Sequence, residues 1–234
     1  MEKYTADDLA VWSTLFERQV KNLQTKGSEH YLNCLRNMNA VLNGNEIPDF
    51  QKINHWFESS SGWRIEVVPG LIEVDKFFEL LAQKKFCSST WLRSMKNLDY
   101  LEEPDMFHDT FGHIPLLSDP VFSEFAHEFG KLGVQLSGDE QALIELQRLY
   151  WFTIEFGVIL EGEDPKVYGA GIISSFGETN KIANRNCTFL KYDLDEILAK
   201  SFKTDEMQEE YFLIESFEQL VRSLKQMKKT AVPN

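Results

Sequence analysis

Three side chains in this 234-residue chain could act together on a metal ion. His108 and His113 lie five residues apart in EEPDMFHDTFGHIPLL (102–117), and the chain has only five histidines. Glu155 is the only ionisable carboxylate in LYWFTIEFGVIL (149–160), where almost every other residue is apolar. Imidazole nitrogens and carboxylate oxygens are ligands that suit divalent transition metals. These residue types therefore indicate a candidate metal site, provided that the fold brings them together.

The surroundings of Glu155 predict that its carboxylate is buried. A helix that is apolar on every side lies in the interior of a protein. An ionised carboxylate is strongly unfavourable there unless it is paired or binds a metal. From this segment alone two partners remain open: a Lys or Arg on a neighbouring helix, or a metal ion.

The five-residue spacing of the histidines does not suit a continuous α-helix. Residues five apart on such a helix differ by about 140° and do not share a face. We expect Gly112 to end the helix, so that His113 can fold back beside His108. A single histidine here would more often be a core residue. Two histidines beside a helix end favour a ligand pair, although the spacing is not the i,i+4 pattern of helical zinc sites.

Two histidines and one carboxylate with open positions form the ligand set of non-haem Fe(II) oxygenases. Catalytic zinc also uses two histidines and a glutamate, but the HExxH motif of zinc hydrolases is absent. The 2-oxoglutarate oxygenases usually show HxD and a distant histidine on a β-rich chain, which is not the pattern here. An oxygen-activating iron needs electrons, and the chain has no GxGxxG and no Walker motif. We therefore expect a diffusible two-electron reductant.

Helical periodicity and turn residues place these side chains in a mainly helical protein. The predicted helices lie near 5–20, 28–42, 49–60, 75–86, 104–112, 119–136, 139–160, 171–178, 193–198 and 215–226. Strand patterns are short and lie at 64–68, 89–93 and 211–214. The expected fold class is mainly α, or α+β with a few short strands. We expect one catalytic domain over residues 1–228 and a flexible tail at 229–234.

Composition excludes several classes of protein. The net charge of −13 argues against nucleic acid and anionic membranes as partners. The three cysteines are odd in number and widely spaced, which argues against a disulfide framework. No secretory signal and no apolar run long enough for a membrane span is present. We expect a cytoplasmic protein, and the 18 phenylalanines suggest an aromatic-rich core or pocket.

Three separate motifs carry a resemblance to a known family. PDMFHDTFGHIPLL, RLYWFTIEFG and YGAGIISSFGE, in this order, resemble the pterin-dependent aromatic amino acid hydroxylases. The similarity is closest to the short bacterial phenylalanine 4-monooxygenases and extends from YTADDLAVW to YFLIESFEQL. The resemblance implies Fe(II) held by His108, His113 and Glu155, with a tetrahydropterin (tetrahydrobiopterin or a related pterin) as reductant. It further implies hydroxylation of L-phenylalanine to L-tyrosine by O2, as in phenylalanine catabolism.

The resemblance also implies a set of cofactor-binding residues. Phe77 would stack on the pterin ring; the alternative is that it is only one of an FF pair on an amphipathic helix. The other residues that would surround the pterin are Gly70, Ile72, Asp109 and Tyr150. The residue after the first iron histidine is Asp109 here, where animal members have a longer Glu.

A second implied set surrounds the substrate. Arg93 would pair with the amino acid carboxylate, a bidentate role that suits a guanidinium group. Pro104, Trp151 and Phe156 would wall the aromatic ring, although Trp151 and Phe156 could be ordinary core residues. Gly171 and Ser174 would border the substrate, and Ser174 would also hold an iron histidine in place.

Parts of the chain depart from the pattern of the animal enzymes. Leu101 stands where those enzymes have a threonine, and the segment after SSFGE does not align clearly over 179–190. The chain also lacks their N-terminal regulatory domain and long heptad tail, so a monomer is expected.

Other activities remain open at the level of sequence. The same chemistry could act on L-tryptophan or at the meta position, since a few pocket side chains decide this preference. A zinc hydrolase with the same three ligands and a non-catalytic pterin- or metal-binding module are further alternatives.

Overall fold

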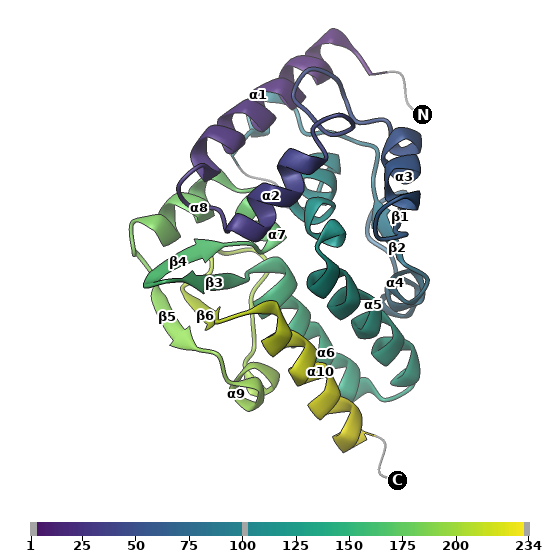
Figure 1. Cartoon of the computed structure of the whole chain (residues 1–234), viewed down its shortest axis with the longest axis vertical. Coiled ribbons are helices and arrows are strands. Elements are labelled where there is room, and N and C mark those ends of the chain that lie inside the picture. The colour runs from purple at the N-terminus through teal and green to yellow at the C-terminus, as the bar shows by residue number, and fades with distance from the viewer. Residues whose placement is uncertain (1–3, 100–102, 232–234) are drawn as a thin grey trace.

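The computed structural model describes residues 4–99 and 103–231 (Figure 1). Its α-helices are α1 (Ala6–Leu23), α2 (Glu29–Asn37), α3 (Phe50–Glu58), α4 (Val74–Ala82), α5 (Pro120–Gln135), α6 (Glu140–Tyr150), α7 (Ala170–Ile173), α8 (Phe176–Ala183), α9 (Leu194–Ala199) and α10 (Phe217–Ala231). The strands are β1 (Arg64–Val67), β2 (Lys85–Ser88), β3 (Val158–Glu161), β4 (Asp164–Val167), β5 (Thr188–Lys191) and β6 (Glu210–Ile214). The mainly helical fold class is confirmed.

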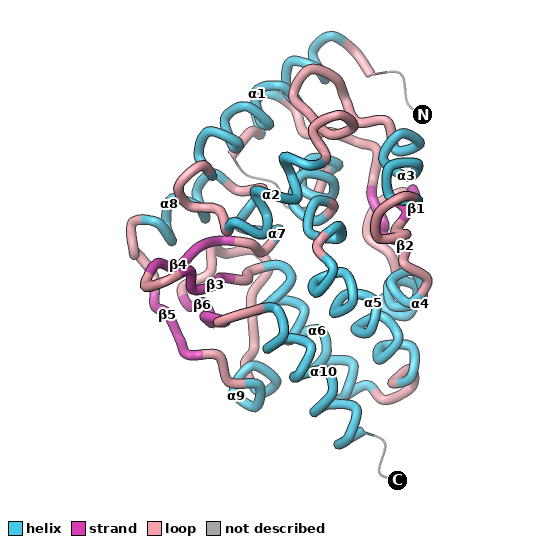
Figure 2. The backbone as a smooth tube through the Cα atoms, viewed as in Figure 1, coloured by secondary structure: helices cyan, strands magenta, loops and turns pink. Residues whose placement is uncertain are grey.

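The strands form two small sheets on opposite sides of the helices (Figure 2). β1 and β2 pair in parallel, and the second sheet has the order β4-β3-β6-β5. The predicted helix over 75–86 ends earlier, because its last residues belong to β2, and no strand forms at 89–93. The sequence reading also missed β3, β4 and β5, which are only four residues long and alternate weakly between buried and exposed positions.

Helix boundaries follow local capping signals. Thr5 and Asp8 form a reciprocal capping box at the start of α1, as the Thr5/Asp8 pattern predicts. Asp119 caps α5 by accepting bonds from the backbone N–H groups of Val121 and Phe122. At the other end of the chain, α10 continues to Ala231 and so enters the segment for which we expected a flexible tail.

Helix α5 runs through the middle of the lower half of the molecule, with α4 and α10 packed against it (Figure 1). Two glycines allow the close contact between α4 and α5. A Cβ atom on Gly130 would lie 2.4 Å from the backbone nitrogen of Ala82. A Cβ atom on Gly133 would lie 2.1 Å from the ring of Phe78. These contacts hold α4, which carries Phe77, in a fixed position.

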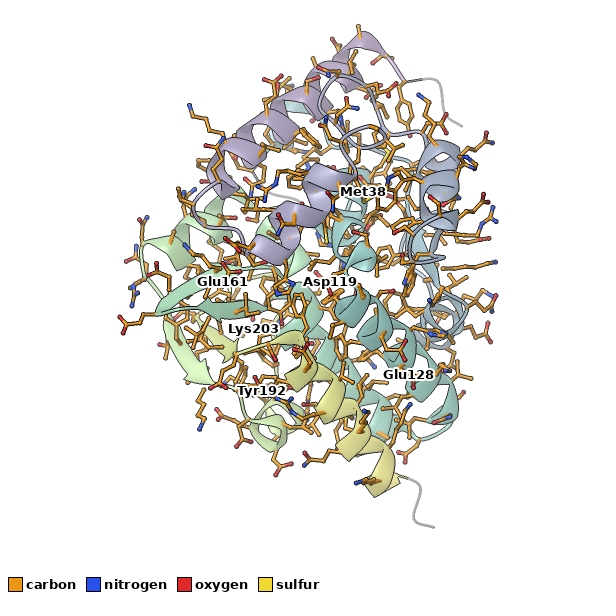
Figure 3. The ribbon with its side chains drawn as sticks, in the orientation of Figure 1. Met38, Asp119, Glu128, Glu161, Tyr192 and Lys203 are labelled. Carbon is orange, nitrogen blue, oxygen red and sulfur yellow. The ribbon has the colours of Figure 1, made fainter. Side chains whose placement is uncertain are left out.

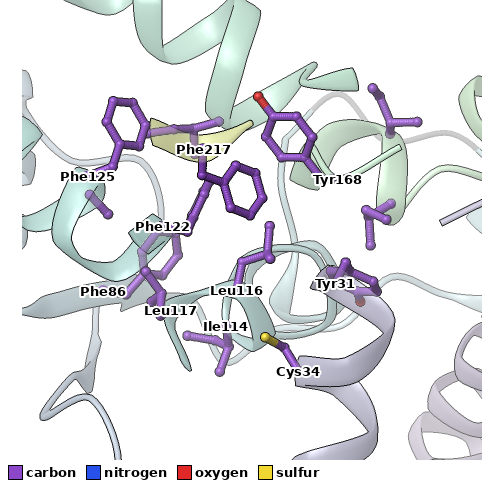
Figure 4. Close-up of a cluster of buried hydrophobic side chains, with 14 of the residues drawn as sticks. Tyr31, Cys34, Phe86, Ile114, Leu116, Leu117, Phe122, Phe125, Tyr168 and Phe217 are labelled. Atoms are coloured by element: carbon purple, nitrogen blue, oxygen red, sulfur yellow. The ribbon is translucent and has the colours of Figure 1, made fainter. Parts of the chain in front are cut away.

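The core continues up to the segment that follows the second histidine. Ile114, Leu116 and Leu117 are at most 2% exposed and point into a cluster with aromatic side chains from several elements (Figure 4). Among these, Tyr31 donates a 2.5 Å hydrogen bond to the backbone oxygen of Phe111, which lies between the two histidines. Burial of this apolar surface fixes the backbone on which the histidines stand.

An ion pair between α2 and the start of α5 predicts a small dependence of stability on pH. His30 Nδ1 lies 2.9 Å from Asp119 Oδ2, and Figure 3 shows Asp119 below the N-terminal end of α2. The hydrogen bond to Asp119 raises the pKa of His30 above its ordinary 6.5. The protonated His30 therefore stabilises the folded state fully below about pH 6.5, and this stabilisation is lost as the pH rises through its raised pKa.

We therefore expect His30→Gln to lower the free energy of unfolding more at about pH 6 than at about pH 8.5. The His30 side chain is 46% exposed, so solvent screening limits the difference to about 0.5 kcal/mol. Urea unfolding at both pH values measures it, with His55→Gln, 88% exposed, as the control. An equal loss at both pH values would contradict the assignment.

Candidate metal centre and active-site cavity

The two histidines share a face because the segment His108–His113 is a π-helix. Hydrogen bonds in a π-helix join residue i to residue i+5, so His113 lies about one turn beyond His108. Their Nε2 atoms are 3.2 Å apart. Our expectation that Gly112 ends the helix is wrong, because helical backbone continues through Gly112 to Ile114.

Gly112 has a different function, which is to allow a close approach by α7. A Cβ atom on Gly112 would lie 2.9 Å from the backbone oxygen of Ala170 and 3.1 Å from its Cβ atom. The YGAGIISSFGE motif thus packs directly on the backbone between the histidines.

Glu155 also lies on a π-helix, formed by Trp151–Glu155 at the end of α6. The backbone N–H of Phe156 closes it with a 2.9 Å bond to the oxygen of Trp151. The helix predicted to continue to Leu160 ends here, and the chain enters β3. A Cβ atom on Gly169 would lie 2.5 Å from the oxygen of Glu155, so the third motif packs closely against this segment too.

The three candidate ligand atoms converge on one point. Glu155 Oε1 lies 3.0 Å from His113 Nε2, and Glu155 Oε2 lies 3.6 Å from His108 Nε2. Metal–ligand bonds of about 2.0–2.2 Å place neighbouring ligands of one ion about 3.0–3.5 Å apart. Among the described residues, no Lys or Arg forms an ion pair with Glu155. The salt-bridge alternative is therefore wrong, and the donor set fits a divalent metal.

Ser174 prepares His108 for metal binding. The Ser174 hydroxyl donates to the backbone oxygen of Ala170 at 2.8 Å, so its oxygen can accept from Nδ1–H of His108 at 3.0 Å. A proton on Nδ1 leaves the lone pair of Nε2 free for a metal. The structure thus places Ser174 against His108, one of the two candidate metal-binding histidines.

Electrostatics favour the ligating form of these groups at neutral pH. Burial lowers the pKa of His108 to about 4, and the neighbouring His113 acts in the same direction. Burial alone would raise the pKa of Glu155, but the two histidines lower it to about 2. A neutral imidazole and an ionised carboxylate are the forms that bind metal.

The three ligands line a cavity of about 300 Å³. Ten of the fourteen residues expected at the site line it: Gly70, Ile72, Phe77, Pro104, His108, Asp109, His113, Tyr150, Trp151 and Glu155. Four do not: Arg93, Phe156, Gly171 and Ser174.

The residues expected around the pterin all line the cavity: Gly70, Ile72, Phe77, Asp109 and Tyr150. The ring of Phe77 on α4 meets that of Tyr150 edge-on at 5.3 Å between centroids. Asp109 Oδ2 accepts a 2.9 Å hydrogen bond from the backbone N–H of Ser89. Burial raises the pKa of the Asp109 carboxyl to about 7.

Arg93 lies beside the cavity and is held by a residue to which the sequence reading gave no site role. Asp105 accepts from Nε and Nη2 of Arg93, both at 2.8 Å, and from its backbone N–H at 3.0 Å. The carboxylate also accepts a 3.1 Å bond from the backbone N–H of His108. Asp105 thus links the segment of Arg93 to the helix that begins at His108. Its position after Pro104 predicts only the start of a helix.

Phe202 is a further aromatic residue of the cavity, beside Trp151, that the sequence alone did not indicate. The ring of Phe202 stacks on Trp151 at 4.4 Å and 13°, and Phe202 lines the cavity. Gln208 accepts a 3.1 Å bond from the indole N–H of Trp151. Phe156 packs on the same indole at 4.6 Å, and Gly171 lies against Phe156. No local pattern marks Phe202, because it comes from the loop between α9 and β6.

Of the two places where the sequence departs from the animal enzymes, one is not described and the other does not line the cavity. Leu101 lies outside the described residues. The segment 179–190 forms the second half of α8, a turn and the start of β5, and no residue in it lines the cavity.

The fold and the site together define a metalloenzyme of the two-histidine, one-carboxylate type, with a mainly helical catalytic domain.

Comparisons with known proteins specify the family. The family model for the biopterin-dependent aromatic amino acid hydroxylases matches residues 2–232. Phenylalanine-4-hydroxylase of Chromobacterium violaceum is 41% identical over 221 residues, covering 94% of this chain and 73% of the relative. The chain therefore belongs to the biopterin-dependent aromatic amino acid hydroxylases.

Solved structures agree with this assignment. The Chromobacterium violaceum enzyme with bound Fe(III) matches with a TM-score of 0.91 at 39% identity, covering 99% of this chain and 86% of that one. The same enzyme with Fe(III) and 7,8-dihydrobiopterin matches with a TM-score of 0.89 at 39% identity, covering 98% and 84%.

Proposed function

We propose that the chain is a phenylalanine 4-monooxygenase, which converts L-phenylalanine to L-tyrosine with O2, Fe(II) and a tetrahydropterin. The observation that carries the proposal is the convergence of His108, His113 and Glu155, whose ligand atoms all lie within 4.8 Å of one another. They stand in a cavity with aromatic walls. Relatives of this chain bear the name phenylalanine-4-hydroxylase, and one of them binds iron together with dihydrobiopterin.

His108, His113 and Glu155 would hold the iron. Iron and tetrahydropterin, when bound, supply the activation of O2 and the electrons for it. The protein itself orients the three side chains that would bind the iron. Ser174 holds the His108 ring, and the two π-helices fix the ligand backbones.

We assign the pterin to the wall formed by Gly70, Ile72, Phe77, Asp109 and Tyr150. The face of Phe77 would stack on the flat ring of the cofactor. The carboxylate of Asp109 would accept from an N–H group at its edge.

We assign the substrate to the side where Trp151 and Pro104 line the cavity and Phe156 supports the indole. Arg93 would bind the amino acid carboxylate through the N–H groups of Nη1 and Nη2 that remain unused, since Asp105 takes Nε and one N–H of Nη2 and Leu98 O takes one of Nη1. Gly171 and Ser174 would border the same region. Enclosing aromatic walls exclude water and hold the ring near the metal.

We further propose one catalytic domain that acts as a monomer in the cytoplasm. The described residues contain no helix long and apolar enough to cross a membrane. All three cysteines are unpaired, which suits a reducing compartment.

A reconstitution assay tests the proposed function. We expect tyrosine only when Fe(II), a tetrahydropterin and phenylalanine are all present, and none with Zn(II) in place of iron. Tyrosine formed without pterin would contradict the proposal. If hydroxylated tryptophan is the main product, the substrate is tryptophan, and if meta-tyrosine is the main product, the ring is hydroxylated at the meta position. Hydrolysis with zinc would show that the protein is a hydrolase.

A further inference from the structure

One polar side chain of the cavity has neither a role in the proposed reaction nor a partner in the protein. Ser89 lines the cavity and is only 3% exposed. Within the described part of the chain, its Oγ atom has no hydrogen-bond partner. Buried hydroxyl groups almost always have a partner, so an unpaired one at a ligand cavity points to a ligand.

Ser89 lies next to the segment that we assign to the pterin. Ser89 directly follows β2, and the oxygen of Ser88 accepts a 3.0 Å bond from the backbone N–H of Val68, next to β1. The chain beyond β1 supplies Gly70 and then α4 with Phe77. Ser89 at the end of β2 is therefore a neighbour of the segment after β1 that is assigned to the cofactor.

Ser89 is also joined to Asp109, a polar group that we assign to the pterin. The backbone N–H of Ser89 donates to Asp109 Oδ2 at 2.9 Å, and no described residue donates to Oδ1. A carboxylate only accepts hydrogen bonds, whereas a serine hydroxyl can donate one. The Asp109 carboxylate therefore supplies an acceptor, and the Ser89 hydroxyl supplies a donor.

We propose that the Ser89 hydroxyl, together with Asp109, binds the amide-like edge of the pterin ring, which carries an N–H donor beside a carbonyl acceptor. Asp109 accepts from the N–H group and Ser89 donates to the carbonyl oxygen. L-phenylalanine has no such edge, because its ammonium and carboxylate are separated by the Cα atom and its ring carries no polar atom. The inference rests on the proposed function, since it takes the cofactor to be a pterin. Ser89 is a cofactor-positioning residue in this view.

Ser89→Ala tests the assignment by equilibrium binding. Titration calorimetry of the iron-loaded protein with 7,8-dihydrobiopterin, under anaerobic conditions, should give a Kd about 3- to 10-fold weaker, the equivalent of about 0.7–1.4 kcal/mol for one hydrogen bond. Ser89→Thr keeps the hydroxyl and should bind within about 2-fold of the wild type. In turnover, KM for the pterin should rise while KM for phenylalanine stays within about 2-fold.

Ser61→Ala is the matched control. Its Oγ atom is also buried without a partner in the described part of the chain, but Ser61 does not line the cavity. This variant should leave pterin binding unchanged. The ligand-free Ser89→Ala protein should melt no lower than the wild type, because the hydroxyl that it loses has no partner in the protein.

The outcomes separate the two proposals. If the wild type binds no pterin, the proposed function fails and the assignment of Ser89 fails with it. If the wild type binds the pterin and Ser89→Ala binds it equally well, only the assignment of Ser89 is overturned. A lower melting temperature with unchanged pterin affinity would show a structural role, and a selective loss of phenylalanine affinity would move Ser89 to the substrate side.

Discussion

Glu155→Ala is expected to abolish pterin-dependent hydroxylation and to weaken Fe(II) binding by more than about 100-fold. Loss of a residue that only supports a metal ligand already costs about 10- to 100-fold in affinity, and Glu155 supplies one of three ligand atoms. The effect is large because no other described carboxylate lies within 4.8 Å of the two histidines to replace it.

Thermal unfolding measures this loss without turnover. Iron at about 100 times its Kd stabilises a folded protein by about 2.7 kcal/mol, which raises the Tm of a chain of this size by about 5–10 °C. We expect this rise for the wild type and for Glu145→Ala, a control on α6 outside the cavity. Glu155→Ala should show no rise. Activity and iron-induced stabilisation similar to the wild type would rule out Glu155 as a required ligand.

Asp105→Ala is expected to lower the free energy of unfolding by about 3–5 kcal/mol, since it leaves a buried guanidinium without its partner. The Arg93 and Asp105 side chains are 7% and 0% exposed. The variant also removes the acceptor for the backbone N–H of His108, so the histidine segment should loosen. Urea unfolding of the metal-free protein measures the effect.

Asp99→Ala provides the contrast, because it breaks an Asp–Arg pair with Arg18 in which the Asp99 side chain is 76% exposed. An exposed pair contributes about 0–1 kcal/mol. Asp105→Asn keeps the shape of the side chain, so its loss in free energy of unfolding should lie between those of Asp105→Ala and Asp99→Ala. It should also raise KM for phenylalanine, because the Arg93 guanidinium group changes its orientation. Equal losses from Asp105→Ala and Asp99→Ala would show that the buried pair contributes no special stability.

The ligand segments illustrate why unusual helices occur at functional sites. Both His108–His113 and Trp151–Glu155 are π-helices, which are rare and are found mostly as short turns at such sites. The wider turn brings residues five apart onto one face, which an α-helix cannot do. Helix α7 and the residue before it pack closely against both segments, at Gly112 and through Gly169.

Several features of the protein follow from its sequence alone. The apolar surroundings of Glu155 indicate a buried carboxylate that needs a partner, and the mainly helical fold follows from periodicity and caps such as Thr5 and Asp119. These inferences succeed because they depend on residues close together in the chain. The three motifs further indicate the family, which the comparison confirms, and imply the three candidate metal ligands, since each motif is a continuous stretch.

Only the tertiary structure decided the geometry that makes these residues a site. The fold brings the π-helix His108–His113 against α7, some sixty residues away in the sequence, where Gly112 leaves room for Ala170. The pairing of Arg93 with Asp105 and the stacking of Phe202 on Trp151 also join separate segments. The same holds for the Ser89 hydroxyl, whose lack of a partner depends on every element around it. Such contacts are set by how the elements pack in three dimensions, and no local pattern of residues encodes them.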